Sequence, residues 1–411
     1  LLQALVGASE KAAHIARLCR REEPLFQLLV AEKTGADRNK RFLQDFKTLA
    51  DVLIQEVIKH DLGKEFPELQ GHIHGEESNE FKNRQGETVT VRVCAAAGDT
   101  AALLLSVLDP EREAAELLAA AVHRDVELGD TELANVALSV PPQDLAIWID
   151  PIGDGTLGCR VGGVQDPGMM GSGWLGHWGG RDPRVQGTGE LGLWGAGEGV
   201  PGTPRCGLEG DRDPGGLGWL GHWGVWDLRV RVIGGQDPGV KGPLPPRRWQ
   251  GRYHWGVAYG DTRLSSLSPP PLRPQTRVVL SRAEGGAVPG ALGPLCGDRL
   301  RFAAGAGYKM LCVILGLAEA YVLSEGSTFA WDACGPHAIL RALGGGTVAL
   351  AGALRARGGG DTGNPPELVY NRPVEGAAGA ERWANRGGLV AYVHPQHLEA
   401  VLAALATVPG L

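Results

Sequence analysis

Three groups of acidic residues, far apart in the chain, are the residue types that could do metal chemistry. Glu76 and Glu77 lie at a predicted loop or strand end, Asp150 follows a short apolar run, and Asp332 opens a predicted helix. Carboxylates in such places can converge at one end of a sheet, where their hard oxygen atoms suit Mg²⁺. Each group alone is more typical of solvated loop acids or a helix N-cap. Their combination points to a divalent-metal site.

The elements that must position these carboxylates can be predicted from hydrophobic periodicity. Apolar residues recur at helical spacing over 4–19, 43–59, 103–108, 111–122, 332–343 and 398–405. Strands are predicted over 88–93, 145–149 and 347–350, and a helix followed by a strand over 308–324. Pro336 falls near the start of its helix, where proline is tolerated. Ordinary globular patterning therefore covers both ends of the chain.

Composition excludes several classes of protein. The 411 residues allow two packed domains or one large one, and an apolar content of 43% excludes wholesale disorder. A net charge of −7 without a long basic run argues against a nucleic-acid or anionic-membrane partner. The best apolar run, 310–323, is interrupted by Glu319 and is too short to span a membrane. Seven scattered cysteines without C-x-x-C are typical of reduced thiols. With no export signal at the start, a cytoplasmic protein is expected.

The middle of the chain, 153–246, has a different composition. Between 157 and 246 lie 27 of the 63 glycines and six of the eleven tryptophans. GWLGHWG occurs at 173–179 and again at 218–224, which superficially suggests propeller blades, but two copies cannot close a propeller. Such glycine density makes ordering costly. The segment is therefore predicted to be a disordered insert, and our hypothesis is that it is translated non-coding sequence. A third possibility is a Trp/Gly-rich interaction module.

Several longer stretches resemble one enzyme superfamily. These are FKTLAD (46–51), GEESNEF (75–81), WIDPI (148–152), YHWG (253–256), CGDR (296–299), AAGAGYK (303–309), WDAC with HAILR (331–341) and RWANRGG (382–388). With them, 1–152, 247–265 and 278–405 resemble the Mg²⁺-dependent, lithium-sensitive phosphatases of the inositol monophosphatase and fructose-1,6-bisphosphatase superfamily. The resemblance implies an α+β fold, a layered α/β/α/β/α sandwich. Its N-terminal half (1–152) would carry metal motifs, and its C-terminal half (247–411) the substrate-binding turn and last metal ligand.

The resemblance also implies a set of site residues. The implied metal ligands are Asp51, Glu76, Glu77, Asp150, the Ile152 carbonyl, Asp154 and Asp332. The implied catalytic residues are Asp51, Glu76 and Thr156, with Asp51 pairing with a threonine to orient the attacking water. The implied substrate-binding residues are Asp154, Gly155, Thr156, Gly305, Ala306, Lys309 and Ser327. Paired metal ions would lower the pKa of bound water and neutralise the phosphate.

The implied function is Mg²⁺-dependent, Li⁺-inhibited removal of the 1-phosphate from inositol 1,4-bisphosphate and inositol 1,3,4-trisphosphate in phosphatidylinositol signalling. The partners would be small-molecule inositol phosphates, with no nucleic acid and no membrane, and the protein a monomer. Water would be the nucleophile, so no Ser/His or Cys/His pair is needed. His72 and His74 have strand-like metal spacing, but a polar strand face is the simpler interpretation, and His337 is read as a helix residue.

The chain departs from the superfamily pattern at two places. Gly153 is interposed in the turn after Ile152. Either the turn bulges to recover Asp154 and Thr156, or Gly153 replaces the aspartate and a ligand is lost. One residue moves the chain by roughly 3.3 Å, far beyond the tolerance of metal coordination.

Further along, Ala283 and Gly285 stand where the superfamily has a Ser-x-Lys phosphate contact. Arg282 could supply the charge but not the geometry. The alternative function is therefore a catalytically impaired relative, or a damaged gene model that keeps the outer scaffold.

Overall fold

The computed structural model describes residues 1–21, 30–33, 46–83, 85–126, 133, 136, 145–151, 253–359 and 364–411. The Gly/Trp-rich segment 153–246 lies outside these ranges, and so do four predicted site residues: Ile152, Asp154, Gly155 and Thr156.

The N-terminal half packs helices around short strands. Its helices are α1 (Leu2–Arg21), α3 (Leu49–Glu65), η1 (Pro67–His72), α4 (Ala97–Leu108) and α5 (Arg112–Val122), and its strands are β1 (Val30–Glu32), β2 (Phe46–Thr48), β3 (Ile73–Gly75), β4 (Glu80–Lys82), β5 (Thr88–Thr90) and β6 (Ile147–Ile149). The strands pair as β1-β2, β4-β5 and, in parallel, β3-β6. One apolar cluster joins α1, α3, α4, α5 and the strands, because each helix presents an apolar stripe to its neighbours.

The C-terminal half is built on a five-stranded sheet. Its strands are β7 (Gly256–Tyr259), β8 (Thr262–Ser265), β9 (Val278–Leu280), β10 (Leu300–Phe302), β11 (Ala320–Leu323), β12 (Gly346–Ala349) and β13 (Leu389–Tyr392), and its helices are α9 (Ala287–Cys296), η3 (Gly297–Arg299), α10 (Ala306–Ile314), α11 (Ala330–Ala342), α12 (Leu350–Gly358), η4 (Gly379–Trp383) and α13 (Pro395–Leu405). The sheet order is β10-β9-β11-β13-β12; β9 is parallel to β10 and β11, and β13 is antiparallel to β11 and β12. Strands β9 and β11 are buried along their whole length because helices cover both faces.

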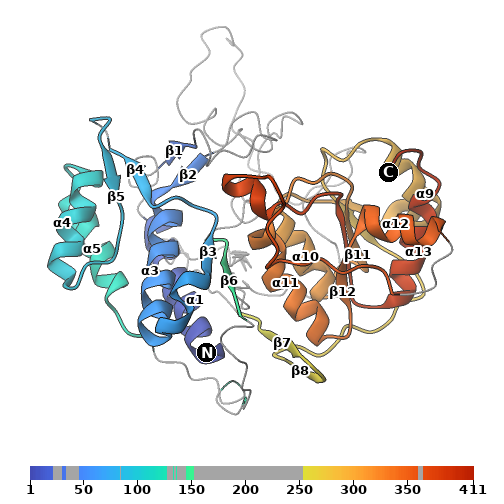
Figure 1. The fold of residues 1–411 in the computed structure, drawn as a ribbon, viewed down its shortest axis with the longest axis horizontal. Coiled ribbons are helices and arrows are strands. Elements are labelled where there is room, and N and C mark those ends of the chain that lie inside the picture. Colours follow the sequence, from blue (N-terminus) through green and yellow to red (C-terminus); the bar gives the residue numbers. More distant parts are fainter. Residues whose placement is uncertain are drawn as a thin grey trace, which may run out of the picture.

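The layers follow one another across the molecule (Figure 1). Helix α3 lies against β3, with α1 packed on α3, and α11 packs between the β3-β6 pair and the five-stranded sheet, beside α10. Helices α9, α12 and α13 cover the outer face of the sheet. The predicted α/β/α/β/α layering is confirmed.

Where β13 meets β11, the chain needs a glycine. Gly388 has φ +72°, and a Cβ there would lie 2.2 Å from the Leu323 carbonyl oxygen. Only glycine combines that backbone conformation with so close an approach. The RWANRGG stretch therefore ends in a residue that allows the central strands to pair.

Most predicted elements are found, but helix α3 starts later than predicted. The periodicity predicted a helix from residue 43, whereas Phe46–Thr48 forms strand β2 and the helix begins at Leu49. The physical reason is a capping box: Thr48 accepts from the Asp51 backbone N–H, and the Asp51 carboxylate accepts from Thr48 N–H. Pro336 lies inside α11, which begins at Ala330, two residues earlier than predicted.

Among the described cysteines, Cys19, Cys94, Cys296 and Cys334 are free thiols. Among the described helices, none combines the length and the apolar character needed to cross a bilayer.

Candidate active site

The candidate site begins where strands β3 and β6 end. These strands are parallel, with Gly75 opposite Ile149, so Glu76 and Asp150 follow at adjacent positions. The Glu76 N–H donates to the Ile149 carbonyl at 3.2 Å, which continues the pairing to the start of the acidic loop. The carboxyl ends of neighbouring parallel strands meet at one edge, a frequent place for ligand binding. Strand pairing thus brings together acidic residues that lie 74 positions apart in the sequence.

Helix α3 holds the backbone of Glu77 through one buried side chain. Gln55 Nε2 donates to the Glu77 carbonyl at 2.5 Å, and the Glu77 N–H donates to Gln55 Oε1 at 2.9 Å. Gln55 is fully buried, and a Cβ at Gly75 would collide with its side chain. The glycine before Glu76 therefore leaves room for the glutamine that fixes Glu77. Gln55 gave no signal in the sequence, where it reads as one polar residue of a helix.

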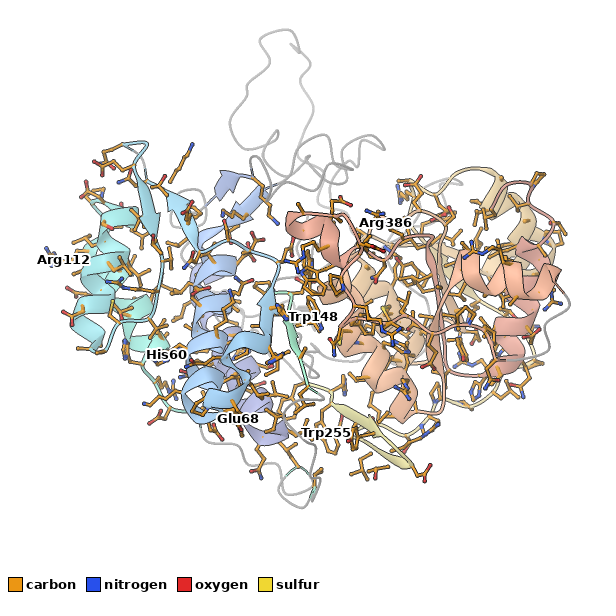
Figure 2. The ribbon with its side chains drawn as sticks, viewed as in Figure 1. His60, Glu68, Arg112, Trp148, Trp255 and Arg386 are labelled. Carbon is orange, nitrogen blue, oxygen red and sulfur yellow. The ribbon has the colours of Figure 1, made fainter. Side chains whose placement is uncertain are left out.

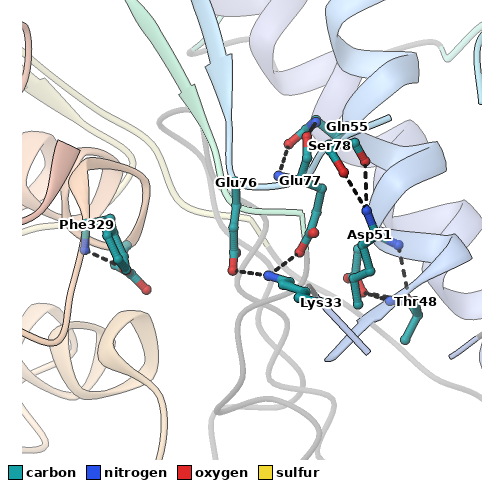
Figure 3. A network of polar contacts seen from close by, with 10 residues as sticks. Lys33, Thr48, Asp51, Gln55, Glu76, Glu77, Ser78 and Phe329 are labelled. Atoms are coloured by element: carbon teal, nitrogen blue, oxygen red, sulfur yellow. Dashed lines mark hydrogen bonds and ion pairs between the residues drawn. The ribbon is translucent and has the colours of Figure 1, made fainter. Parts of the chain in front are cut away.

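A buried lysine binds both glutamates. Lys33, directly after β1, places its Nζ 2.7 Å from Glu76 Oε1 and 2.7 Å from Glu77 Oε1 (Figure 3). The side chains of Lys33 and Glu77 are only 3% and 4% exposed, and that of Glu76 is 30% exposed. Lys33 gave no signal in the sequence, because it belongs to no motif and lies more than forty residues from its partners.

Asp51 lies at the other side of this group, on the first turn of α3. Its Oδ2 accepts hydrogen bonds from Thr48 Oγ1 at 2.7 Å and from the Thr48 N–H at 2.8 Å. Burial raises the pKa of Asp51 to about 6, although the hydrogen bonds from Thr48 and the charge of Lys33 lower it. Burial also raises the pKa of Glu77 well above its usual value, against the charge of Lys33. The metal-free site is therefore crowded with negative charge.

The raised pKa of Asp51 predicts a pH dependence of stability. Between about pH 4 and pH 6, the folded protein binds more protons than the unfolded chain, so its free energy of unfolding falls as pH rises. Asp51→Asn is expected to remove at most about 3 kcal/mol of this fall. Urea unfolding in chelator at pH 4, 5, 6 and 7 measures the difference between the two proteins. Parallel pH curves would contradict the prediction, and the raised pKa of Glu77 should leave some slope in both.

Asp332 belongs to the C-terminal half, on the helix that packs against β6. It lies on the first turn of α11, where Oδ2 accepts from the Phe329 N–H at 2.7 Å. Phe329 stacks on Trp331, and the Trp331 ring centroid lies 6.5 Å from that of Trp148 on β6. Figure 3 shows Phe329 on the opposite side of Glu76 from Asp51. Helix α11 therefore carries Asp332 toward the end of β6, although its carboxylate also serves as a helix cap.

Trp148 is the centre of the junction between the halves (Figure 2). It is 1% exposed, stacks on His74 at 4.6 Å between ring centroids and meets the edge of Trp383 at 4.7 Å. Its Nε1 donates to Asn371 Oδ1 at 3.1 Å. His74 thus contacts aromatic rings instead of forming a polar strand face, and burial lowers its pKa. Trp148 and His74 each lie two residues before a candidate metal ligand.

The residues at this site fit a divalent cation in part. The donors are hard carboxylate oxygens, and the Lys33 ammonium shows that Glu76 and Glu77 can share one cation. Glu77 Oε2 is buried and has no hydrogen-bond partner among the described residues, so it can serve as a ligand. Within the ranges given above, no three His, Cys, Asp or Glu side chains gather closely enough to hold a metal ion.

The predicted substrate residues of the C-terminal half lie at the carboxyl ends of the parallel strands. Gly305 has φ +75° and precedes Ala306, the first residue of α10, so helix N–H groups face the loop after β10. Lys309 is buried, with Nζ 3.4 Å from the Ala303 carbonyl and 5.0 Å from the centroid of Tyr321. Ser327, in the loop before α11, is partly exposed.

Tyr321 connects Lys309 to Asp332. Burial is the main cause that raises the pKa of Tyr321, and the negative charge of Asp332 is the next. Lys309 and Asp332 thus act on the same ring, from α10 and α11.

The second departure from the superfamily pattern lies in the loop after β9. Ala283 and Gly285 are exposed, whereas Glu284 between them is buried and accepts from the Ser324 N–H at 2.8 Å. Glu284 therefore ties this loop to the end of β11, and burial raises its pKa.

Comparison with known proteins shows which family this chain resembles. The model of the inositol monophosphatase family matches residues 249–398. The inositol polyphosphate 1-phosphatase of Bos taurus is 41% identical over 428 residues, covering 98% of this chain and 96% of its own, and that of Homo sapiens is 39% identical with the same coverage. The first alignment covers 98% of the chain, so it extends on both sides of residues 153–246.

Among solved structures, an inositol monophosphatase from Anabaena matches 33% of this chain and 45% of its own, at 17% identity and a TM-score of 0.23. An inositol monophosphatase-fructose 1,6 bisphosphatase matches 34% and 46%, at 14% identity and a TM-score of 0.25. These superpositions are too partial to carry an argument. The identity to the curated relatives, over nearly the whole of both chains, shows that the protein belongs to the inositol monophosphatase family, alongside the inositol polyphosphate 1-phosphatases.

Proposed function

We propose that the chain is a phosphoric monoester hydrolase that removes the 1-phosphate from inositol polyphosphates, with Mg²⁺ as its cofactor. The substrates would be inositol 1,4-bisphosphate and inositol 1,3,4-trisphosphate, as the names of the relatives suggest. The observation that carries the proposal is the pairing of Glu76 and Glu77 with the buried Lys33 ammonium at the end of β3, beside the end of β6 that Asp150 follows. Such a group can hold a cation against a phosphate.

In this proposal Glu76, Glu77, Asp150 and Asp332 hold the metal. When bound, Mg²⁺ would supply Lewis acidity toward the phosphate and lower the pKa of the attacking water. Asp51 would orient that water: Thr48 occupies Oδ2, which fixes the direction of Oδ1 as the acceptor. A carboxylate with a pKa of about 6 is suited to act as a general base near neutral pH.

The C-terminal half would bind the inositol phosphate. The N–H groups at the start of α10, after Gly305, favour an anion, and Lys309 adds a positive charge beside the Tyr321 ring. We propose Ala306 and Ser327 as further contacts. The predicted roles of the Ile152 carbonyl, Asp154, Gly155 and Thr156 remain proposals of the family resemblance. We further propose a cytoplasmic monomer that acts in phosphatidylinositol signalling.

Release of phosphate from inositol 1,4-bisphosphate tests the function. We expect release that requires Mg²⁺, stops in excess chelator and is inhibited by Li⁺. Phosphate release that continues unchanged in chelator would contradict the proposal, because Glu76, Glu77, Asp150 and Asp332 are proposed to act only as metal ligands. Inositol 1,4-bisphosphate should be hydrolysed only at the 1-position, which the identity of the monophosphate product checks.

A catalytically impaired protein is the second candidate, favoured by the substitutions Ala283 and Gly285 and by the interposed Gly153. A chimera in which residues 153–246 are replaced by the matching segment of the bovine relative separates the two. Mg²⁺-dependent release by the chimera alone would assign the defect to the middle segment. Release by both would exclude impairment, and release by neither would place the defect in the described halves.

The same segment tests the non-coding hypothesis. Peptides from 160–240 in the expressed protein, at the level of the flanking peptides, would contradict it.

A further inference from the structure

The cation that now binds Glu76 and Glu77 belongs to the protein itself. Lys33 Nζ makes both contacts at 2.7 Å, from a side chain that is 3% exposed. A buried ammonium loses most of its hydration, so it remains charged in such a place only beside anionic groups. The two carboxylates have the same need for a cation. Lys33 and the glutamates therefore stabilise one another in the metal-free protein (Figure 3).

A divalent cation and this ammonium would need the same oxygens. Mg²⁺ binds carboxylate oxygens at about 2.0–2.1 Å and repels a second cation within hydrogen-bond distance of the same atoms. Lys33 has a flexible four-carbon stem, so its ammonium can leave without a change in the backbone. One positive charge also balances the glutamates incompletely, with Asp51 close enough to raise the pKa of Glu77 further. A divalent ion would balance this charge better.

We propose that Lys33 is an internal counter-cation that competes with the divalent metal for Glu76 and Glu77. In the metal-free protein it holds the two carboxylates in place, and metal binding displaces it from at least one of them. Lys33 thereby weakens metal affinity, while it keeps the Glu76 and Glu77 carboxylates in position when no metal is bound. It is a positioning residue, and the inference rests on the proposed metal dependence.

The alternative is that Lys33 strengthens metal binding instead of competing with it. Glu77 Oε2 is buried without a hydrogen-bond partner among the described residues, so a metal could bind there while Lys33 keeps Oε1. In that arrangement Lys33 would orient the ligands and strengthen metal binding. The two roles predict opposite signs for the effect of removing the ammonium.

Calorimetric titration of the full chain with Mn²⁺ measures that sign without an activity assay. For Lys33→Met we expect a Kd about tenfold lower than that of the parent protein, or about 1.4 kcal/mol, together with a lower Tm in chelator. Lys33→Arg keeps a cation and should bind Mn²⁺ with a Kd within about threefold of the parent value. A Kd for Lys33→Met that is unchanged or higher would overturn the proposal.

Lys11 provides a matched control. It is another buried lysine, paired with Asp61 between α1 and α3. Lys11→Met should lower the Tm in chelator and leave the Mn²⁺ Kd within about twofold, which separates affinity from stability. An equal gain in affinity for Lys11→Met would overturn the proposal, because the effect would then not depend on contact with the glutamates.

A structure of the parent protein with Mn²⁺ keeps the proposal testable if Lys33→Met does not fold. Lys33 Nζ should then lie more than 4.0 Å from at least one of the two Oε1 atoms, the limit for an ion pair; both contacts intact beside bound Mn²⁺ would overturn it. Failure of the parent protein to bind Mn²⁺ would instead contradict the proposed function, so the two failures are distinguishable.

Discussion

Replacing Glu77 by glutamine is expected to lower the rate of Mg²⁺-dependent phosphate release by about 10²- to 10³-fold. The amide keeps the size of the side chain and the backbone hydrogen bonds to Gln55, but it removes a buried negative charge from the proposed metal site. Higher Mg²⁺ concentration should recover part of the loss. Steady-state phosphate release over a range of Mg²⁺ concentrations measures both effects.

Stability separates this loss of activity from misfolding. The new amide oxygen can still accept a hydrogen bond from Lys33, and a neutral amide costs less to bury than a carboxylate whose pKa is already raised. The free energy of unfolding in chelator should therefore change by less than about 2 kcal/mol. Glu80→Gln, at an exposed position of β4, is the control and should retain activity. Full activity of Glu77→Gln would exclude Glu77 as a metal ligand.

Trp148→Ala is expected to lower the free energy of unfolding by about 3–5 kcal/mol. The indole fills the junction between β6, α11 and η4, where it contacts His74, Trp331 and Trp383. Its removal leaves a large cavity and breaks the hydrogen bond to Asn371. Urea unfolding followed by circular dichroism measures the loss.

Two further variants show whether the effect belongs to the junction. Trp148→Phe keeps a ring but loses the hydrogen bond to Asn371, so we expect a loss of about 1–2 kcal/mol. Leu117→Ala, at a side chain that is 43% exposed, should change the free energy of unfolding by less than about 0.5 kcal/mol. Equal losses for Trp148→Ala and Leu117→Ala would show that the two halves do not depend on this contact.

Hydrophobic patterns in the sequence predicted the helices and strands whose burial follows from nearby residues. The apolar run that ends at Ile149 became the buried strand β6, and the helical periodicity over 332–343 became α11. The predicted start of α3 was wrong. Thr48 and Asp51 cap the helix at a point where apolar spacing alone would have extended it toward the N-terminus. Periodicity reports which face of a segment is buried, whereas a capping box depends on two particular polar side chains.

The sequence motifs indicated the family and identified the candidate carboxylates. Glu76, Glu77, Asp150 and Asp332 could be selected in the sequence because each lies at the start or end of a recognisable element. Their roles at a metal site remain predictions. The sequence could not show that Glu76 and Asp150 are neighbours, because that depends on the parallel register of β3 and β6.

By itself, then, the sequence determined the order of helices and strands, the α/β/α/β/α architecture through its family motifs, and the acidic residues at the strand ends. Only the tertiary structure decided which cation the glutamates hold, what Gln55 fixes and what joins the two halves. Lys33 meets Glu76 across 43 positions and Trp148 meets Asn371 across 223. Contacts of that range arise from the packing of layers, so no short stretch of residues encodes them.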